Sequence, residues 1–371
     1  MAEDPSKSSK EPGFIKIIFN DIKTFFDDIR RGLMKDSLGQ EFDELKAFFL
    51  DSDRRRRLEK MNTIKRWLFM TGWLLKALML KLTSTRRILT LISLFLILSR
   101  NDDGDNNKAV FGSMLLLFVL LLELKDKLMA RNELAAGRTV QNALMPDTQP
   151  DIPGWQVWLF SRPANEVGGD LVDYLPVNSN RFGIALGDVA GKGLGAALLM
   201  AKLQATLRAL APDVTSLGDL GTRMNRIMYR DGLPNSFASL VYLEIAPESG
   251  DVAMLNAGHL PPVVLRHSQL TETEKGQPAM GLTADITYKE LKLDLQRGEF
   301  LIVFSDGLTE ARNAEGEFYG EKRLFQLLPT LSRLSVEDLG NRVLQGVEHF
   351  VGHERVNDDL SMVILKRTDN G

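Results

Sequence analysis

VGGDLVDYLPVNSNRFGIALGDVAGKGLGAALLM, residues 167–200, carries the strongest structural signal in this 371-residue chain. Asp170 and Asp188 each follow a glycine directly, and residues 182–186 between them are apolar enough to form a short buried strand. A glycine-rich turn after Asp188 leads into a strongly helical run that begins at Ala196. Carboxylates at strand ends, beside glycines that let the backbone approach closely, suit a site for hard divalent cations. Gly-Asp pairs are also common in tight turns, so this stretch alone leaves a purely structural role open.

Two more segments place carboxylates at the ends of apolar runs. Asp306 follows residues 301–304 (LIVF), and Asp358 and Asp359 precede residues 360–365 (LSMVIL). Four separate strand ends that each present a carboxylate are difficult to explain as turn chemistry. The sequence therefore favours one acidic, metal-binding site assembled from distant parts of the chain.

The composition excludes several classes of function. Apolar residues make up 44% of the chain, so a large core can form, and the length suits two domains. The net charge of −3 gives no electrostatic basis for binding nucleic acid. The chain has no cysteine, which excludes disulfides, zinc-thiolate sites and cysteine nucleophiles. Its four histidines provide little material for a histidine-rich metal site.

Residues 1–65 are expected to form an amphipathic helical N-terminal region. From Phe14 to Ile29 apolar residues recur at helical spacing, and a second amphipathic piece covers residues 42–49. These helices can either pack within the N-terminal region or lie on a membrane surface, and both interpretations stay open. The first dozen residues are polar, so no cleavable signal peptide is expected.

Residues 66–123 are expected to form a hydrophobic, membrane-associated region with a predicted hairpin of two spans, at about 84–100 and 109–123. A buried helical hairpin in a soluble domain is the alternative. Leucines on all sides of residues 115–122 favour the membrane, because a solvent-facing helix would have a polar face.

The charges around this region predict its orientation. Residues 51–100 contain twelve Lys or Arg and three acids, and Lys125 and Lys127 follow the second span. By the positive-inside rule, both ends of the hairpin would be cytoplasmic. Trp67 and Trp73 could anchor the preceding apolar run at the membrane interface.

Residues 124–146 are predicted to form a signalling or linker helix that ends at Pro146. Pairing of this helix with a second copy would give a homodimer and could transmit a conformational change to the C-terminal domain. A plain spacer remains the alternative.

Residues 147–371 are expected to form one α+β domain. Hairpin signals between neighbouring strands favour an antiparallel layout of two packed sheets with helices outside, which gathers the acidic strand ends at one edge. Strands are predicted at residues 155–160, 171–177, 182–187, 237–245, 251–256, 262–266, 300–304 and 360–366, and helices at 193–210, 216–230, 321–330 and 335–350.

A series of motifs in this domain resembles a known family. In order, the motifs are VGGDLVD, GDVAGKGLGAALLMA, NAGHLPPVVL, FSDGLTEARNAEGEFYG and NDDLSMVIL. They resemble those of the metal-dependent PPM (type 2C) protein serine/threonine phosphatases, in the branch of the bacterial stage II sporulation protein E. The resemblance covers roughly residues 130–368 and implies an αββα sandwich, in which two sheets lie between two layers of helices.

The resemblance also implies a site with two Mn²⁺ or Mg²⁺ ions that activate a water for attack on a phosphate monoester. Asp188 would bridge the ions, and the backbone carbonyl of Val189 would bind one of them. Asp306 and Asp358 would hold the other ion, and Asp170 would bind directly or through water. Eukaryotic members have glycine in place of Val189, which need not matter because the ligand is a carbonyl.

By the same resemblance, the chain is expected to be a signal-controlled phosphatase of the bacterial inner membrane, with its phosphatase domain in the cytoplasm. The implied substrate is phosphoserine or phosphothreonine on a regulatory protein, such as an anti-sigma-factor antagonist. A catalytically inactive, phosphatase-like signalling scaffold is the alternative. A nucleotide-binding protein is disfavoured, because GKGLGAA lacks the spacing of a phosphate-binding loop.

Several neighbouring residues have no role that the sequence can decide. Glu166, Asp173 and Asp359 lie near the predicted ligands, and a supporting or solvated position is favoured for each. His259 can be a general acid or can close a turn between two strands. Lys192 can attract phosphate at a helix start or can be simply solvated.

Overall fold

The structure is a computed structural model that describes residues 57–58, 61–99, 107–146, 149–232, 236–247, 249–352, 354 and 356–368. The chain forms two compact units, Met1–Asp126 and Lys127–Gly371, and the division falls within the long helix α6. The amphipathic helices predicted at residues 14–29 and 42–49 lie outside the described residues.

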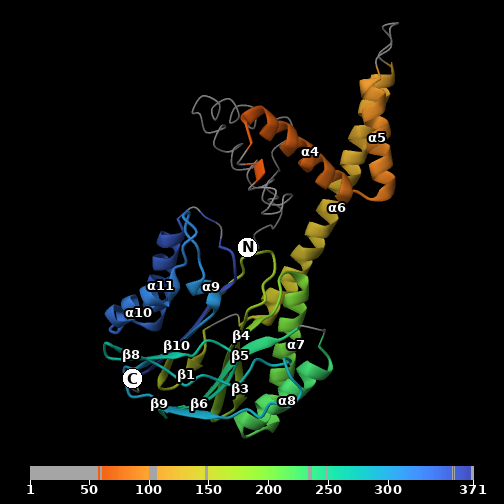
Figure 1. Cartoon of the computed structure of the whole chain (residues 1–371). Coiled ribbons are helices and arrows are strands. Elements are labelled where there is room, and N and C mark those ends of the chain that lie inside the picture. Colours follow the sequence, from red (N-terminus) through yellow and green to blue (C-terminus); the bar gives the residue numbers. More distant parts are fainter. Residues whose placement is uncertain are drawn as a thin grey trace, which may run out of the picture. The chain divides into compact units, whose positions relative to one another are not determined.

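The described part of the first unit is helical (Figure 1). It contains α4 (Thr63–Lys81), α5 (Ser84–Leu98) and the first half of α6 (Asn107–Leu144). Ser93 donates a buried 2.7 Å hydrogen bond to the carbonyl of Gly112, where any Cβ would lie 2.9 Å from the Ser93 carbonyl oxygen. Arg86 on α5 pairs with two acids of α6, Glu123 at 2.8 Å and Asp126 at 2.6 Å. Close helix contact and this ion cluster together hold α5 against α6.

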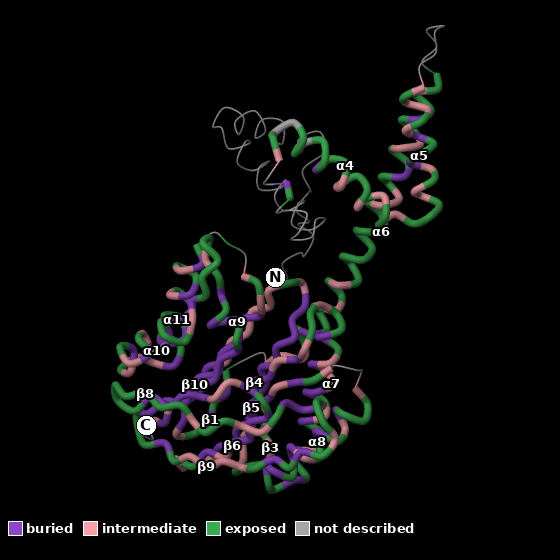
Figure 2. Tube along the Cα trace, viewed as in Figure 1, coloured by how far each residue is buried: buried purple, intermediate pink, exposed green. Residues whose placement is uncertain are grey.

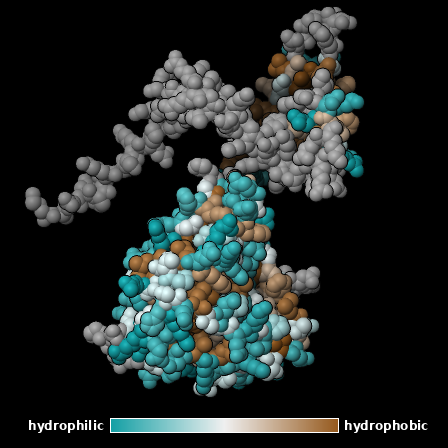
Figure 3. Space-filling view, turned by 60° about the vertical axis from the view of Figure 1, so that its left-hand side comes forward, coloured by the Kyte–Doolittle hydropathy of each residue, from teal (hydrophilic) through white to brown (hydrophobic). Residues whose placement is uncertain are grey.

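The paired helices expose much of their apolar surface, as Figures 2 and 3 show. Phe95 and Leu98 are 72% and 78% exposed, and Phe111 and Met114 on α6 are similarly open. Helix α6 is long and apolar enough to cross a membrane, with 11% of its best window buried. Residues Leu194–Asp213 pass the same test, but 39% of that window is buried, as in the core helix of a soluble domain.

Helix α5 is shorter than the span predicted over residues 84–100. Its 15 residues extend about 22 Å, against the roughly 30 Å of a bilayer core. The apolar helices therefore give a weak indication of membrane association.

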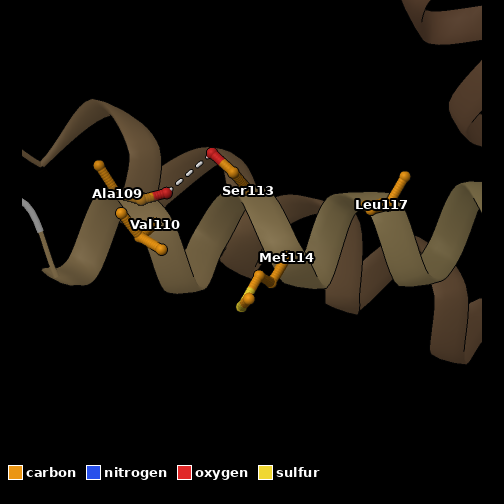
Figure 4. A pocket seen from close by; sticks show the side chains of 5 residues that line it. All are labelled: Ala109, Val110, Ser113, Met114 and Leu117. Atoms are coloured by element: carbon orange, nitrogen blue, oxygen red, sulfur yellow. Dashed lines mark hydrogen bonds between the residues drawn. The ribbon is translucent and has the colours of Figure 1, made fainter.

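One hollow of about 470 Å³ lies along α6. Figure 4 shows that its five lining side chains all come from this one helix: Ala109, Val110, Ser113, Met114 and Leu117. The Ser113 hydroxyl donates to the Ala109 carbonyl at 2.8 Å, so the hollow offers no unengaged side-chain group to orient a ligand.

The second unit contains two antiparallel sheets (Figure 1). The six-stranded sheet has the order β1 (Asp151–Ile152), β2 (Trp155–Arg162), β11 (Leu360–Arg367), β10 (Phe300–Phe304), β7 (Val263–Arg266) and β8 (Gln269–Glu272). The five-stranded sheet has the order β3 (Leu171–Asn178), β4 (Arg181–Val189), β5 (Ala238–Ile245), β6 (Asp251–Ala257) and β9 (Leu291–Asp294).

Helices cover the outer face of each sheet. Apolar side chains from the inner faces, such as Leu186 and Val363, form the core between the sheets. A second core joins the five-stranded sheet to α7 (Leu194–Leu210) and α8 (Leu217–Arg230). A third joins the six-stranded sheet to α9 (Asp306–Thr309), α10 (Gly320–Leu327), the 3₁₀ turn Leu328–Leu331 and α11 (Val336–Val351). The αββα prediction is confirmed.

The eight predicted strands are present, with ends within two residues of those expected. The sequence missed β1, β8 and β9, which have two to four residues and half-exposed patterns with little apolar periodicity. The helix predicted over 321–330 is α10 followed by the 3₁₀ turn, because Pro329 cannot continue an α-helical hydrogen-bond ladder.

Candidate active site

Asp188 lies one residue before the end of β4, opposite Ser239 of β5. The Ser239 hydroxyl donates to the Asp188 carbonyl at 3.3 Å, which fixes the strand end. A Cβ on Gly187 would lie 2.8 Å from the Ser239 carbonyl oxygen, so the glycine permits this pairing. Val189 follows as a buried residue and ends the strand.

Asp170 immediately precedes β3 and is 3% exposed. Its Oδ2 atom is buried and finds no hydrogen-bond partner in the described part of the chain, a costly arrangement for a carboxylate oxygen. Burial raises the pKa of Asp170 well above its usual value, and the charges of Asp188 and Asp359 add to that rise. Hydroxyls of Ser361 and Ser305 act in the opposite direction.

Asp306 and Asp358 come from neighbouring strands of the other sheet. Asp306 begins the single-turn helix α9 two residues after the end of β10, and Asp358 lies two residues before β11. A Cβ on Gly307 would overlap the Asp359 carbonyl oxygen, so the turn at Asp306 approaches the start of β11 only because residue 307 is glycine.

The four acids act on one another electrostatically. The pKa of Asp188 rises to about 7, first through burial and then through the charges of Asp306, Asp358 and Asp359. The pKa of Asp306 is also raised, first by desolvation among the surrounding groups and then by Asp358 and Glu310. The structure thus brings strand ends from both sheets into one acidic region.

Within the described residues, no group of three His, Cys, Asp or Glu side chains has metal-binding geometry. The chemistry of the region nevertheless fits divalent cations. It supplies carboxylate oxygens, including the unpartnered Oδ2 of Asp170, and hard cations such as Mg²⁺ and Mn²⁺ prefer oxygen ligands. Neighbouring carboxylates repel one another, and a bound divalent cation would relieve that repulsion.

Asp359 has a definite structural position. Its carboxylate accepts hydrogen bonds from the backbone N–H groups of Gly169 at 2.5 Å, Ala164 at 2.8 Å and Asp170 at 3.3 Å. A Cβ on Gly168 would lie 2.5 Å from Asp359 Oδ2. Asp359 therefore holds the segment that carries Asp170, a supporting position of the kind that the sequence favoured.

Gln141 is a site-linked residue that sequence reasoning missed. This buried side chain of α6 donates to the Gly168 carbonyl at 2.7 Å and accepts from the Gly168 N–H at 3.0 Å. Gln204 of α7 donates to the Leu144 carbonyl at 2.7 Å, near the end of α6. The final turns of α6 are thereby joined to the segment that leads to Asp170. A lone glutamine on a charged helix gave no signal of this contact.

Residues 178–368 match the profile of the stage II sporulation protein E (SpoIIE) family. The match covers 191 of the 371 residues, more than half of the chain. The chain belongs to the SpoIIE family of PPM-type protein serine/threonine phosphatases.

Relatives of this SpoIIE-family chain include Protein IcfG of Synechocystis sp., 28% identical over 273 residues. That alignment covers 66% of this chain and 43% of IcfG. Phosphoserine phosphatase RsbU of Bacillus subtilis is 23% identical, with 64% of this chain and 70% of RsbU covered. The chain thus spans less than half of IcfG and about two thirds of RsbU.

Solved structures share the SpoIIE-type fold. The SiaA-PP2C domain of Pseudomonas aeruginosa aligns with a TM-score of 0.57 at 18% identity, covering 66% of this chain and 99% of that domain. The RsbU and RsbW domains of Rv1364c from Mycobacterium tuberculosis align at 0.53 and 22% identity, covering 60% of this chain and 62% of that one. At these identities the likeness concerns the fold.

The remaining charged residues near the acidic region of this SpoIIE-family chain form ion pairs or hydrogen bonds of their own. Asp173 accepts two hydrogen bonds from Arg208, at 2.6 and 2.8 Å, and Glu166 lies 3.5 Å from Arg138. Lys192 contacts the Asp358 carboxylate at 3.0 Å and the Asn357 carbonyl at 2.9 Å.

His259 is held within a turn. Its backbone N–H donates to the Asn256 side chain at 3.0 Å, and its carbonyl accepts from the same side chain at 3.3 Å. Burial lowers the pKa of His259 to about 4, so the ring is neutral at physiological pH. This geometry favours the turn-closing interpretation over a general acid.

Proposed function

We propose that this chain is a metal-dependent phosphoprotein phosphatase that hydrolyses phosphoserine or phosphothreonine on a regulatory protein. The observation that carries the proposal is the acidic region formed from both sheets, with the unpartnered Asp170 Oδ2 inside it. RsbU and RsbP of B. subtilis are named phosphoserine phosphatases, which supports the same class of substrate. An anti-sigma-factor antagonist is the partner that this class suggests.

In this proposal Asp188, the Val189 carbonyl, Asp306, Asp358 and Asp170 hold two Mn²⁺ or Mg²⁺ ions. Such ions supply a bound water of lowered pKa and neutralise charge on the phosphoryl oxygens. Asp359 holds the Asp170 segment at the start of β11 by accepting hydrogen bonds from the backbone N–H groups of Gly169 and Asp170. The oxygen-only donor set needs no protein nucleophile, in keeping with a chain without cysteine.

The test is hydrolysis by the full chain purified in detergent, assayed on p-nitrophenyl phosphate and on a phosphoserine protein. We expect phosphate release that requires Mn²⁺ or Mg²⁺ and stops with EDTA, because the ions bind only through exchangeable oxygen ligands. Activity that persists in EDTA would refute the metal mechanism. A folded chain that binds Mn²⁺ and releases no phosphate would support the inactive scaffold instead.

We further propose that α5 and the first half of α6 form the hairpin in the bacterial inner membrane, with the second unit in the cytoplasm. Their exposed apolar side chains support this, and Arg86 and Arg87 at the start of α5 can reach the interface and offset its short length. We expect the full chain to stay in the membrane pellet after carbonate extraction. Complete recovery in the soluble fraction would contradict the hairpin.

Signal control would act through residues 124–146. The Gln141 contact to Gly168 supplies a direct link from this helix to the Asp170 segment. Exposed apolar residues on α6, including Leu128 and Val140, offer material for pairing with a second copy. Light scattering of the detergent-solubilised chain distinguishes this homodimer from a monomer with a plain spacer helix.

A further inference from the structure

A cavity of about 410 Å³ is linked to the acidic region by Ala164, a lining residue whose N–H donates to the Asp359 carboxylate at 2.8 Å. Its lining residues are Arg162, Pro163, Ala164, Asn165, Val356 and Asn357. One wall continues along the chain into the segment that carries Asp170, and the other ends at Asn357, directly before Asp358. The register of β2 with β11 sets Arg162 opposite Leu360, so both walls are anchored on adjacent strands.

The cavity presents hydrogen-bond donors that have no partner among the described residues. Arg162 uses Nη1 to donate to Glu348 at 2.7 Å, and no described residue accepts from its Nε or Nη2. The side-chain amides of Asn165 and Asn357 likewise make no hydrogen bond within the described part of the chain. A guanidinium with free N–H groups beside two amides is a donor set that matches a carboxylate.

The ion pair between Arg162 and Glu348 is easily exchanged. Their side chains are 42% and 52% exposed, and ion pairs at such positions contribute little stability. The guanidinium carbon lies 5.9 Å from the centre of the Phe160 ring, a contact that keeps the side chain near the cavity without using its N–H groups.

Nearby carboxylates are already engaged. Asp358 pairs with Lys192, and Asp359 accepts three backbone hydrogen bonds. Among the described residues that line the cavity there is one cation, Arg162, and no acid, so an acidic residue of a bound polypeptide would find donors there and a basic residue would find no carboxylate in the lining. The cavity is therefore expected to prefer an acidic residue over a basic one.

We propose that this cavity is a substrate subsite that binds an acidic side chain next to the phosphoserine, with Arg162 as the residue that determines the preference. The subsite rests on the proposed phosphatase function, because Asn357 in its lining directly precedes Asp358, so a bound acidic residue would lie one or a few positions from the phosphoserine. It selects among phosphoproteins by the sequence around the phosphoserine.

The test compares two phosphoserine peptides, one with aspartate on both sides of the phosphoserine and one with alanine there, as substrates of the full chain with Mn²⁺. We expect wild type to have a kcat/KM about two- to fivefold higher for the acidic peptide, because a charge pair with a half-exposed guanidinium contributes about this much. In Arg162→Gln the preference falls to about one, through a higher KM for the acidic peptide.

Glu348→Gln is the matched variant, since it removes the same ion pair from the other side. It frees Arg162, so we expect the acidic preference to grow. A merely structural role for the pair would make both variants change in the same direction, which would overturn the proposal, as would equal use of the two peptides by wild type. Failure of wild type to hydrolyse p-nitrophenyl phosphate would instead refute the phosphatase function itself.

Discussion

Asp188→Asn is expected to lower metal-dependent phosphate release by about 10³-fold or more. Asp188 comes from the five-stranded sheet, and the charges of Asp306, Asp358 and Asp359 from the six-stranded sheet all raise its pKa. Removing a carboxylate from such a site forfeits several kcal/mol of transition-state stabilisation, and each 1.36 kcal/mol corresponds to about tenfold in rate. Steady-state assays of the full chain at saturating Mn²⁺ measure the loss.

The same substitution should not destabilise the metal-free fold. At neutral pH the wild-type chain holds like charges together in a partly buried place, and asparagine removes one of them while keeping the shape. The unfolding midpoint in EDTA should therefore stay level or rise, and the upward shift that Mn²⁺ gives wild type should disappear. Inactivity with a lowered midpoint in EDTA would point to misfolding instead of lost metal binding.

Asp219→Asn provides the control for charge removal as such. Asp219 lies on α8, 48% exposed, and pairs with Arg223 at 2.9 Å. Surface pairs of this kind contribute at most about 1 kcal/mol, so activity and the Mn²⁺ shift should match wild type.

The sequence could indicate which acids share one acidic region, because each of them lies beside a recognisable apolar run. A carboxylate next to an apolar run marks a strand end, and the glycines directly before Asp170 and Asp188 mark close approaches that the structure confirms. The antiparallel layout followed from hairpin signals between neighbouring strands. The apolar runs are visible in the sequence because a strand that is buried on both faces needs apolar residues at almost every position.

Other parts of the site depend on contacts between residues distant in the sequence. Asp359 contacts Gly169 across 190 positions, and Gln141 contacts Gly168 across 27. Nothing in the sequence near Gln141 distinguishes it from the other polar residues of a charged helix. Its importance comes from the tertiary fold, which brings a buried backbone segment beside it.

Asp359→Ala should produce the second large effect, a loss of both stability and activity. It leaves the N–H groups of Ala164, Gly169 and Asp170 without their acceptor. Each unsatisfied buried group costs about 1–3 kcal/mol, so the unfolding free energy should fall by roughly 3 kcal/mol or more. At about 2–4 °C per kcal/mol, the unfolding midpoint should drop by roughly 10 °C in a calorimetric scan.

Activity should fall further than this loss of stability explains. At a temperature where Asp359→Ala is still folded, displacement of Asp170 by about 1 Å should reduce kcat about 10²-fold. Asp359→Asn keeps one acceptor oxygen and should lie between alanine and wild type in both measurements.

Gln141→Leu tests the same segment from the side of α6, because it preserves side-chain size and leaves the N–H and carbonyl of Gly168 unpaired. If activity depends on the position of the segment that carries Asp170, Gln141→Leu must lower kcat in the folded chain as well. Full activity in Gln141→Leu, together with loss in Asp359→Ala, would restrict the effect to Asp359 and separate α6 from the site.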